Sequence, residues 1–590
     1  MPAAKYPGGS AVTTASVVEE TEATPFLEPR EHTVPGAARK DSWVGDAEFA
    51  LLPWWRRPSV YWLLGPFFLF TLAFGGCLVP KLNLIVDLVC RKRFADQTLV
   101  DPTFTYAPVN LGADNPQCFI PEVKKSVSMF TMALSLITGI LSAVAAPRLG
   151  HLSDRYGRTK LLALASCGGC ASELIFILCA KFPDVFHYNW LLLAATCDGL
   201  TGSFTAGQIL SNSYTSDCTP PSRRAINFGR VHACLFMGLA VGPLLAAYLV
   251  ALTGSLLSVF YVTLGCHLFF VTFVGLVVPE SLSRERQAIA QKAHDEVRAA
   301  AAVHAAALRA DAAPSSEPSW FNTHIASVWT EAGIAVSHAN VFAPLKALWP
   351  TQPGSSPALR RNLVSFAIVD TILLGAGFSV GTVLLLYCES ENTWNWKTPE
   401  SSRFISAVSF VRVFVLLMLL PAINYFFRTR PAARRARETG RPAADPNAGA
   451  DTLDISLIRV ALLSDLIGSL GYLLARREGV FVASGLLTAV GGLGSATIQS
   501  AATKHVPPEQ VGKLLGAVGL LQALSRVVGP IAFNSLYYAT VGVFDQAIFA
   551  LLVGLFSVAV VTTLFIRPHI YLKDAAAGES EEEPLIRRAD

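Results

Sequence analysis

Long apolar runs are the feature of this sequence that most restricts how it can fold. Each is long enough, at 1.5 Å of rise per residue, for a helix to cross about 30 Å of hydrocarbon. With 52% of its 590 residues hydrophobic and 15% charged, the chain is too apolar for a soluble protein of this size. The sequence predicts an all-α membrane protein with twelve transmembrane helices, near residues 60–89, 126–149, 161–180, 189–212, 227–251, 259–279, 362–388, 404–427, 455–475, 480–502, 512–541 and 544–566.

A long polar segment divides these runs into two sets of six. Within it, Arg284 to Ala313 is rich in alanine and favours a helix. We therefore expect five regions along the chain. They are a disordered cytoplasmic tail over 1–57, a six-helix bundle over 58–279, a partly helical cytoplasmic linker over 280–361, a second bundle over 362–566 and an acidic cytoplasmic tail over 567–590.

The two sets carry the same spacing of proline and glycine. The pattern of Pro220-Pro221, Gly229 and Gly242-Pro243 recurs 287 residues later as Pro507-Pro508, Gly516 and Gly529-Pro530. Such a repeat indicates two halves related by a pseudo-two-fold axis along the membrane normal. Small residues let helices approach closely in lipid, and a Gly-Pro step bends a helix. The alternative is a packing motif without a role in transport.

The distribution of basic residues predicts the orientation. In a twelve-helix arrangement most of them flank the runs on one side, which the positive-inside rule assigns to the cytoplasm together with both termini. Arg91, Lys92, Arg93, Lys124 and Lys125 are exceptions at the first outer loop. Because the basic residues sit beside spans, the net charge of +4 does not indicate nucleic-acid binding.

The cysteines allow one bond across the outer face. Of eleven cysteines, Cys90, Cys118 and Cys388 fall at or beyond that face. Free thiols are the favoured expectation, and a Cys118–Cys388 disulfide in an oxidising compartment is the alternative. Cys167-Gly-Gly-Cys170 lies within a span and lacks a second pair or a histidine, so we predict packing and no metal site.

The loop between the second and third runs, GHLSDRYGRTK over Gly150–Lys160, resembles the signature loop of the major facilitator superfamily. On the fifth run, Gly229, Gly238 and Gly242-Pro243 are similar to the antiporter motif of that superfamily, with Ala246 and Ala247 in place of its last two glycines. Gly512–Gly516 resembles the eleventh helix of tetracycline/proton antiporters, and residues 199–217 are similar in spacing to proton-coupled folate transporters. One departure is Asp198, where many proton antiporters of the family carry an arginine on the fourth helix.

The resemblance implies that the loop latches a gate. Asp154 is expected to meet the N-terminal end of a helix in the opposite half, the eleventh, while Arg158 pairs with Asp217. The alternative is that the basic residues only set orientation. The latch residues are Gly150, Asp154, Arg155, Gly157, Arg158 and Asp217.

Ionisable residues deep within spans are costly and indicate function or pairing. Asp370 is the leading proton or substrate residue, because the superfamily lines its central path with helices one and seven, and Arg412 is its expected partner. The alternative for this pair is a permanent structural ion pair. Other proton or substrate candidates are Asp198, Glu173, Asp465 and Arg526, with neutral hydrogen-bonding groups at Gln208 and Asn212.

These features predict a monomeric secondary transporter of a small solute that works by alternating access, with no cofactor and driven by a proton gradient. Antiport is favoured over symport, and a non-transporting sensor on the same fold is the alternative. No nucleotide-binding loop, metal-ligand cluster or nucleophile–base arrangement indicates an enzyme. Glu581, Leu585 and Ile586 resemble an acidic dileucine signal for a sorting adaptor, so we expect the plasma membrane or a vacuolar or endolysosomal membrane.

Overall fold

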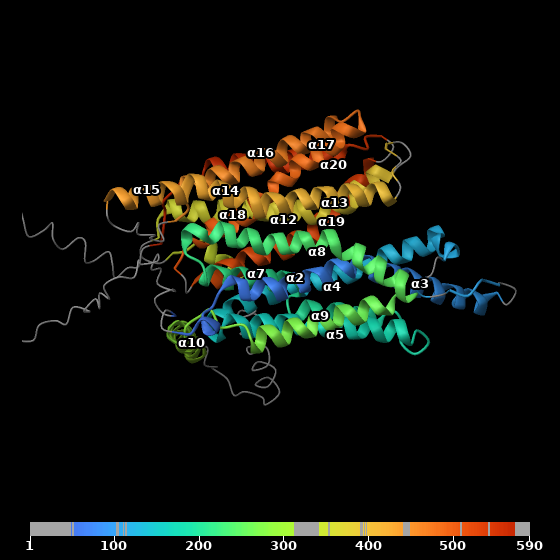
Figure 1. Cartoon of the computed structure of the whole chain (residues 1–590). Coiled ribbons are helices and arrows are strands. Elements are labelled where there is room, and N and C mark those ends of the chain that lie inside the picture. Colours follow the sequence, from blue (N-terminus) through green and yellow to red (C-terminus); the bar gives the residue numbers. More distant parts are fainter. Residues whose placement is uncertain are drawn as a thin grey trace, which may run out of the picture. The chain divides into compact units, whose positions relative to one another are not determined.

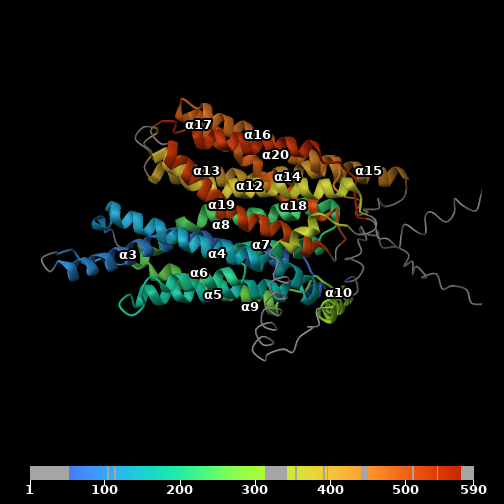
Figure 2. The same ribbon diagram turned by 180° about the vertical axis from the view of Figure 1, so that it is seen from behind.

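The computed structural model describes residue 49 and residues 52–572, with gaps at 102–104, 110, 112–114, 312–341, 352–354, 390–392, 395, 397, 440–448, 508–509 and 541–542. Every regular element in these ranges is a helix, which confirms the predicted all-α class. Eleven of the described helices are long and apolar enough to cross a bilayer. The fold is that of two six-helix bundles, and Figures 1 and 2 show the long helices running alongside one another.

The first half begins with a broken helix and ends before the linker. Short 3-10 turns, η1 (Trp54–Arg56), η2 (Pro116–Phe119) and η3 (Pro221–Arg223), separate some of its helices. The helices are α2 (Val60–Gly76), α3 (Leu78–Val100), α4 (Pro121–Tyr156), α5 (Arg158–Lys181), α6 (Trp190–Leu200), α7 (Ser203–Asp217), α8 (Arg224–Thr253) and α9 (Leu257–Leu276).

The linker contributes α10 (Arg284–Asp311) and the 3-10 helix η4 (Ala343–Leu348). In the second half, the eighth span is one continuous helical stretch in which two π-helical turns alternate with α-helix. The elements are α12 (Pro357–Glu389), α13 (Thr398–Phe414), η5 (Val415–Leu419), α14 (Leu420–Asn424), η6 (Tyr425–Thr429), α15 (Arg430–Thr439), α16 (Thr452–Leu474), α17 (Glu478–Thr488), η7 (Ala489–Gly491), α18 (Gly492–Thr503), α19 (Val511–Thr540) and α20 (Ala547–Leu564).

The fourth predicted span is divided, which corrects the expectation of an uninterrupted helix. Gly202 and Ser203 have φ angles of +83° and +52°, in the left-handed region that ends one helix and starts another. As a result α6 and α7 are each too short to count as a span, although together they cover the predicted stretch. Irregular backbone at this depth is tolerated where protein or a polar cavity surrounds it.

Glycines allow the closest helix pairs to form. A Cβ on Gly75 would lie 2.5 Å from the carbonyl oxygen of Gly238, and one on Gly76 would lie 3.1 Å from that of Gly242. These contacts bring α2 and α8 together within the first half. Between the halves, α4 packs along α19, and α8 packs against α13 and α18. The described residues consequently form one compact unit despite the two-bundle organisation.

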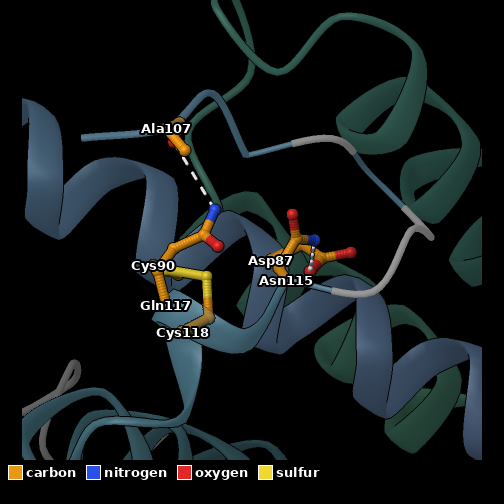
Figure 3. The surroundings of a disulfide bond; sticks show 6 residues. All are labelled: Asp87, Cys90, Ala107, Asn115, Gln117 and Cys118. Carbon is orange, nitrogen blue, oxygen red and sulfur yellow. Dashed lines mark hydrogen bonds between the residues drawn. A yellow bond between two sulfur atoms is a disulfide. The ribbon is translucent and has the colours of Figure 1, made fainter.

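The observed disulfide joins Cys90 to Cys118, so both the free-thiol expectation for these two cysteines and the alternative Cys118–Cys388 bond are wrong. Cys90 lies on the extension of α3 beyond the predicted first run, and Cys118 lies on η2, with 5.5 Å between their Cα atoms. Figure 3 shows Asn115 beside this bond, its amide donating to Asp87 at 2.8 Å. The bond therefore pins α3 to the segment that leads into α4. We call this end of the molecule the disulfide end, and the opposite end, which carries the α4–α5 loop, the loop end.

Candidate functional site

At the loop end, Arg158 is fully buried between two carboxylates. Its Nη1 lies 2.6 Å from Asp154 Oδ1, and its Nε donates to Asp217 Oδ2 at 2.8 Å. Arg158 also donates to the hydroxyl of Ser153 at 2.6 Å, while Ser281 donates to Asp217 at 3.2 Å. A buried ion requires such compensation, because an unpaired charge there would cost several kcal/mol. The expected pairing of Arg158 with Asp217 is thus present.

Asp154 faces the opposite half of the molecule. A Cβ placed on Gly512, in the first turn of α19, would clash with the carboxylate of Asp154 and lie 2.6 Å from Nη1 of Arg158. A Cβ on Gly150 would lie 2.9 Å from the carbonyl oxygen of Gly512, and one on Gly516 would lie 3.1 Å from that of Pro147. Only glycine therefore permits α4 and α19 to touch here, and the helix N-terminus next to Asp154 favours its negative charge.

Glu280 holds this loop in place and was missed by sequence reasoning. Gly157 has a φ of +102°, and beyond it the carboxylate of Glu280 accepts from the backbone N–H groups of Arg158 at 2.8 Å and Thr159 at 3.1 Å. The same carboxylate accepts from the backbone of Ser281. An acidic residue directly after the sixth run was the available signal. Arg155, another predicted latch residue, is half-buried and accepts through its carbonyl from Gln291 of α10.

A hydrogen-bonded chain of side chains crosses between the halves at mid-depth. Gln208 donates to Asn212 at 3.3 Å, Asn212 on α7 donates to Gln499 on α18, and Gln499 donates to Asp370 on α12 at 3.3 Å. Gln522 on α19 donates to the other oxygen of Asp370 at 2.5 Å. All five side chains are buried. Asn212 and Gln499 are 287 residues apart and occupy corresponding positions in the repeat.

The expected partnership of Asp370 with Arg412 is wrong. In the described part of the chain, Asp370 makes no ion pair with a lysine or arginine, and its hydrogen bonds come from neutral amides. Arg412 instead stacks over the ring of Phe236 at 5.1 Å and interacts electrostatically with Asp465. The helix faces explain this difference, because depth in the membrane does not determine the direction in which a side chain points.

A polar cavity of about 80 Å³ lies within the first half beside the break between α6 and α7. Lys81 forms an ion pair with Glu173 on its wall and lies 4.7 Å from the centre of the Phe176 ring. Asp198 accepts from the hydroxyl of Ser203 at 2.7 Å. The cavity is lined by Phe70, Phe74, Cys77, Lys81, Ala165, Ser166, Gly169, Ser172, Glu173, Asp198, Ser203, Phe204, Gly207 and His267. Glu173 and Asp198 are predicted candidates, and Lys81 is an additional member of this site.

Arg526 connects this cavity to the second half. From α19 it donates to the hydroxyl of Thr205 at 2.9 Å and lies 5.7 Å from the centre of the Phe204 ring. It also interacts electrostatically with Asp198. A second cavity of about 20 Å³, room for roughly one water molecule, is lined by both halves: Phe204, Thr205, Gln208, His232, Leu235, Leu374, Gln522 and Arg526.

The predicted helix-bend residues lie at close helix contacts. Gly238 and Gly242 meet the backbone of α2, Gly229 meets the side chain of Leu420 across the halves, and Gly529 meets Ser379 on α12. Pro243 and Pro530 lie inside α8 and α19, which continue past them without a break. The predicted adaptor signal at Glu581, Leu585 and Ile586 lies outside the described residues.

Comparisons with known proteins agree with this architecture. The model of the Major Facilitator Superfamily matches residues 93–437, more than half of the chain. The MFS-type transporter avaJ of Aspergillus versicolor is 27% identical over 509 residues, which cover 85% of this chain and 88% of that protein. The tetracycline resistance protein, class H, of Pasteurella multocida is 20% identical, with coverage of 72% and 84%.

Among solved structures, the human organic anion transporter MFSD10 (TETRAN) superposes with a TM-score of 0.59 at 16% identity, covering 87% of this chain and all of that one. The proton:xylose symporter XylE superposes with a TM-score of 0.53 at 14% identity, covering 88% and 98%. At such identities these structures bear on the fold alone. The match to the family model over more than half of the chain, together with the transporter relatives, establishes that this chain belongs to the major facilitator superfamily and is a membrane transporter.

Proposed function

We propose that the protein is a proton-coupled secondary transporter of a small organic solute, working by alternating access, with antiport as its direction of coupling. The observation that carries this proposal is Asp370, a carboxylate buried at the contact between the halves with amide partners only. An ionised carboxylate without a counter-ion is expensive in such a place. Exchange of its proton, as the halves separate and water reaches it, supplies the coupling.

The proposed cycle starts from a state that is closed at the loop end. Contacts between Asp154 and α19 hold that end together, and we propose that it faces the cytoplasm. Opening it separates Asn212 from Gln499, so the amide chain that supports Asp370 is broken in each cycle. Asp370 lies at the contact between the halves, and this contact exists in one conformation and is lost in the other. Proton binding at Asp370 is therefore coupled to the conformational change.

We propose that the solute binds at the cavity beside the α6–α7 break and at its neighbour between the halves. The two cavities are lined by acidic and basic side chains and by the rings of Phe70, Phe74 and Phe204. This lining suits a polar or zwitterionic solute with an apolar part. A discontinuous helix at mid-membrane is a common element of transporter binding sites. Relatives named for tetracycline resistance support an organic solute.

The remaining features of the proposal concern the cellular setting. The disulfide end faces an oxidising compartment, which supports an outer or luminal position for Cys90 and Cys118. The tail with Glu581, Leu585 and Ile586 would then lie in the cytoplasm, where a sorting adaptor reads it. Localisation of the Leu585→Ala, Ile586→Ala double variant tests this address, since loss of the signal is expected to redistribute the protein to the cell surface.

The test of coupling is transport in proteoliposomes with an imposed pH gradient, using a panel of labelled organic anions, zwitterions and drugs. Wild-type protein is expected to move at least one solute faster with the gradient than without it. Asp370→Asn keeps the size of the side chain and one of the two acceptor oxygens but cannot release a proton, so we expect exchange without gradient dependence. Asp96→Asn, at an exposed site on α3, is the matched control and is expected to behave as wild type. Gradient-independent transport by the wild-type protein would refute proton coupling.

A further inference from the structure

The second half carries its own buried ion cluster at the loop end, which the mechanism above does not use. Asp454, in the first turn of α16, is fully buried between two cations. Lys504 Nζ lies 2.5 Å from Asp454 Oδ2, and Arg428 Nη2 lies 3.0 Å from Asp454 Oδ1. Arg428 also pairs with Asp451 at 2.5 Å. Three helical spans therefore converge on one carboxylate.

This cluster occupies the position that corresponds to the Asp154–Arg158–Asp217 cluster of the first half. Each has one member near the end of its half's second span, one at the start of the third and one at the end of the fourth. Lys504 follows Asp217 by 287 residues, the same offset that relates Asn212 to Gln499. The signs are reversed: a central cation between two anions in one half becomes a central anion between two cations in the other.

The second cluster also reaches across to the opposite half. Arg428 Nη1 donates to the carbonyl oxygen of Ser222, two residues before α8, at 2.7 Å. In the reverse direction Arg224, which starts α8, donates to the carbonyl oxygen of Thr503 at 3.2 Å. Thr503 immediately precedes Lys504. Asp154 makes the equivalent approach in the first half, toward the beginning of α19, so each half holds the start of the other's fifth span.

We propose that Arg428, Asp454 and Lys504 form a second latch of reversed charge, which closes the loop end together with the Asp154 cluster. Asp454 and Asp451 position the guanidinium of Arg428, and the guanidinium holds the chain before α8. Arg224 contributes to the same contact between the halves, because it donates from α8 to the carbonyl oxygen of Thr503. The proposal rests on the alternating-access function proposed above and adds a second set of contacts that must break when this end opens.

The geometry argues against a purely internal role for the cluster. Asp451 and Asp454 satisfy Nε and Nη2 of Arg428, and Nη1 donates both to Asn424 of the same half at 3.1 Å and, at the shorter distance of 2.7 Å, to a carbonyl of the opposite half. An internal support would require no such contact. A hydrogen bond from a guanidinium to a carbonyl is directional. Lysine in place of Arg428 therefore keeps the charge beside Asp454 but loses the forked geometry that also reaches Ser222 in the opposite half.

The experiment measures opening of the loop end without any solute. Leu235→Cys places a thiol on the cavity between the halves, and a charged, membrane-impermeant maleimide is added from the loop side of vesicles. Labelling is measured above that of the parent chain, which retains its native cysteines. Arg428→Lys is expected to speed labelling about fivefold, less than the loss of a whole charge-assisted hydrogen bond, because lysine keeps the charge. The control Arg434→Lys, six residues further on and exposed, is expected to leave the rate unchanged.

Arg224→Lys provides an independent arm from the other half, and it is expected to speed labelling in the same direction. Equal labelling rates in the parent and in both the Arg428 and the Arg224 variants would overturn the second latch, even with wild-type transport intact. If Arg428→Lys does not yield folded protein, the Arg224 variant alone decides the outcome in the same way. Failure of wild-type transport would refute the proposed function instead, because labelling does not depend on a solute.

Discussion

The two halves of this transporter close the loop end with equivalent helices but opposite charges. In the first half, the group that faces the partner half is the carboxylate of Asp154, and in the second it is the guanidinium of Arg428. A carboxylate can be neutralised by a proton, whereas a guanidinium stays charged in proteins. The comparison teaches that the repeat preserves the places of the contacts and not their chemistry, so that the group facing the partner half can be neutralised by a proton only in the first cluster.

The largest expected effect comes from removing the central ion of each cluster. Arg158→Ala leaves Asp154 facing Asp217 without their shared cation, and Asp454→Ala leaves the buried Lys504 without its carboxylate and Arg428 with Asp451 alone. Each is expected to cost about 3–5 kcal/mol of stability. Thermal unfolding of the purified variants in detergent measures this, with Glu438→Ala as the exposed control. Similar losses of stability in the two variants would support an equivalent structural role for the two clusters. A loss in only one variant would contradict it.

Asp154→Asn tests the first cluster as a latch. The amide preserves the size of the side chain, so we expect unchanged protein amount in the membrane. Loss of one charged contact, worth about 1.5–3 kcal/mol, shifts the gate about 10- to 100-fold toward the open state. Transport should fall accordingly, while labelling of Leu235→Cys from the loop side should rise more than in Arg428→Lys. Normal transport by Asp154→Asn would remove the latch role.

Glycines at corresponding positions should respond differently to the same change. A Cβ on Gly516 would press on the backbone of Pro147 at 3.1 Å, whereas one on Gly229 would meet the end of the Leu420 side chain at 2.8 Å. Because a side chain can rotate away and a backbone cannot, Gly516→Ala is expected to cost about 1–3 kcal/mol and Gly229→Ala less. Labelling from the loop side and thermal unfolding of both variants rank them, and an equal effect would contradict the asymmetry.

The smallest effect concerns the residue that follows each cluster, Cys218 in one half and His505 in the other. His505 donates through Nδ1 to the carbonyl of Ala501 at 2.8 Å, and burial lowers its pKa to about 4 from the usual 6.5. The unfolded chain therefore binds a proton that the folded protein does not. Folding stability contributed by this residue is full above pH 6.5 and declines as the pH falls toward 4. His505→Gln should reduce the acid sensitivity of thermal unfolding in that window, whereas Cys218→Ser should leave it unchanged.

Sequence patterns predicted the fold better than the pairings of charges. Run length and spacing are properties of neighbouring residues, so the spans and the 287-residue repeat could be identified directly. The pairing of Arg158 with Asp217 could be expected because the signature loop fixes its local geometry. Lys81 with Glu173, and Arg412 with Asp465, depend on how helices rotate about their axes, which depth along a span does not reveal.

Two further features depend on longer-range structure. Cys90 pairs with Cys118 because α3 extends beyond its apolar run and returns through η2, a path without a sequence signature. The second cluster could have been suspected, since Lys504 stands at the repeat position of Asp217. A search for identical residues in the two halves misses it, because the charges are reversed.

Glu280 has a consequence for the segment that joins the halves. One carboxylate binds the first amides of α5 and also the backbone where the chain leaves α9, and α10 starts four residues later. Through Gln291, α10 is tethered again to the carbonyl of Arg155. The beginning of the linker is thus hydrogen-bonded to the α4–α5 loop at two points, through Glu280 and through Gln291. Binding, cleavage or modification at the start of this linker would therefore act only a few residues away from the latch.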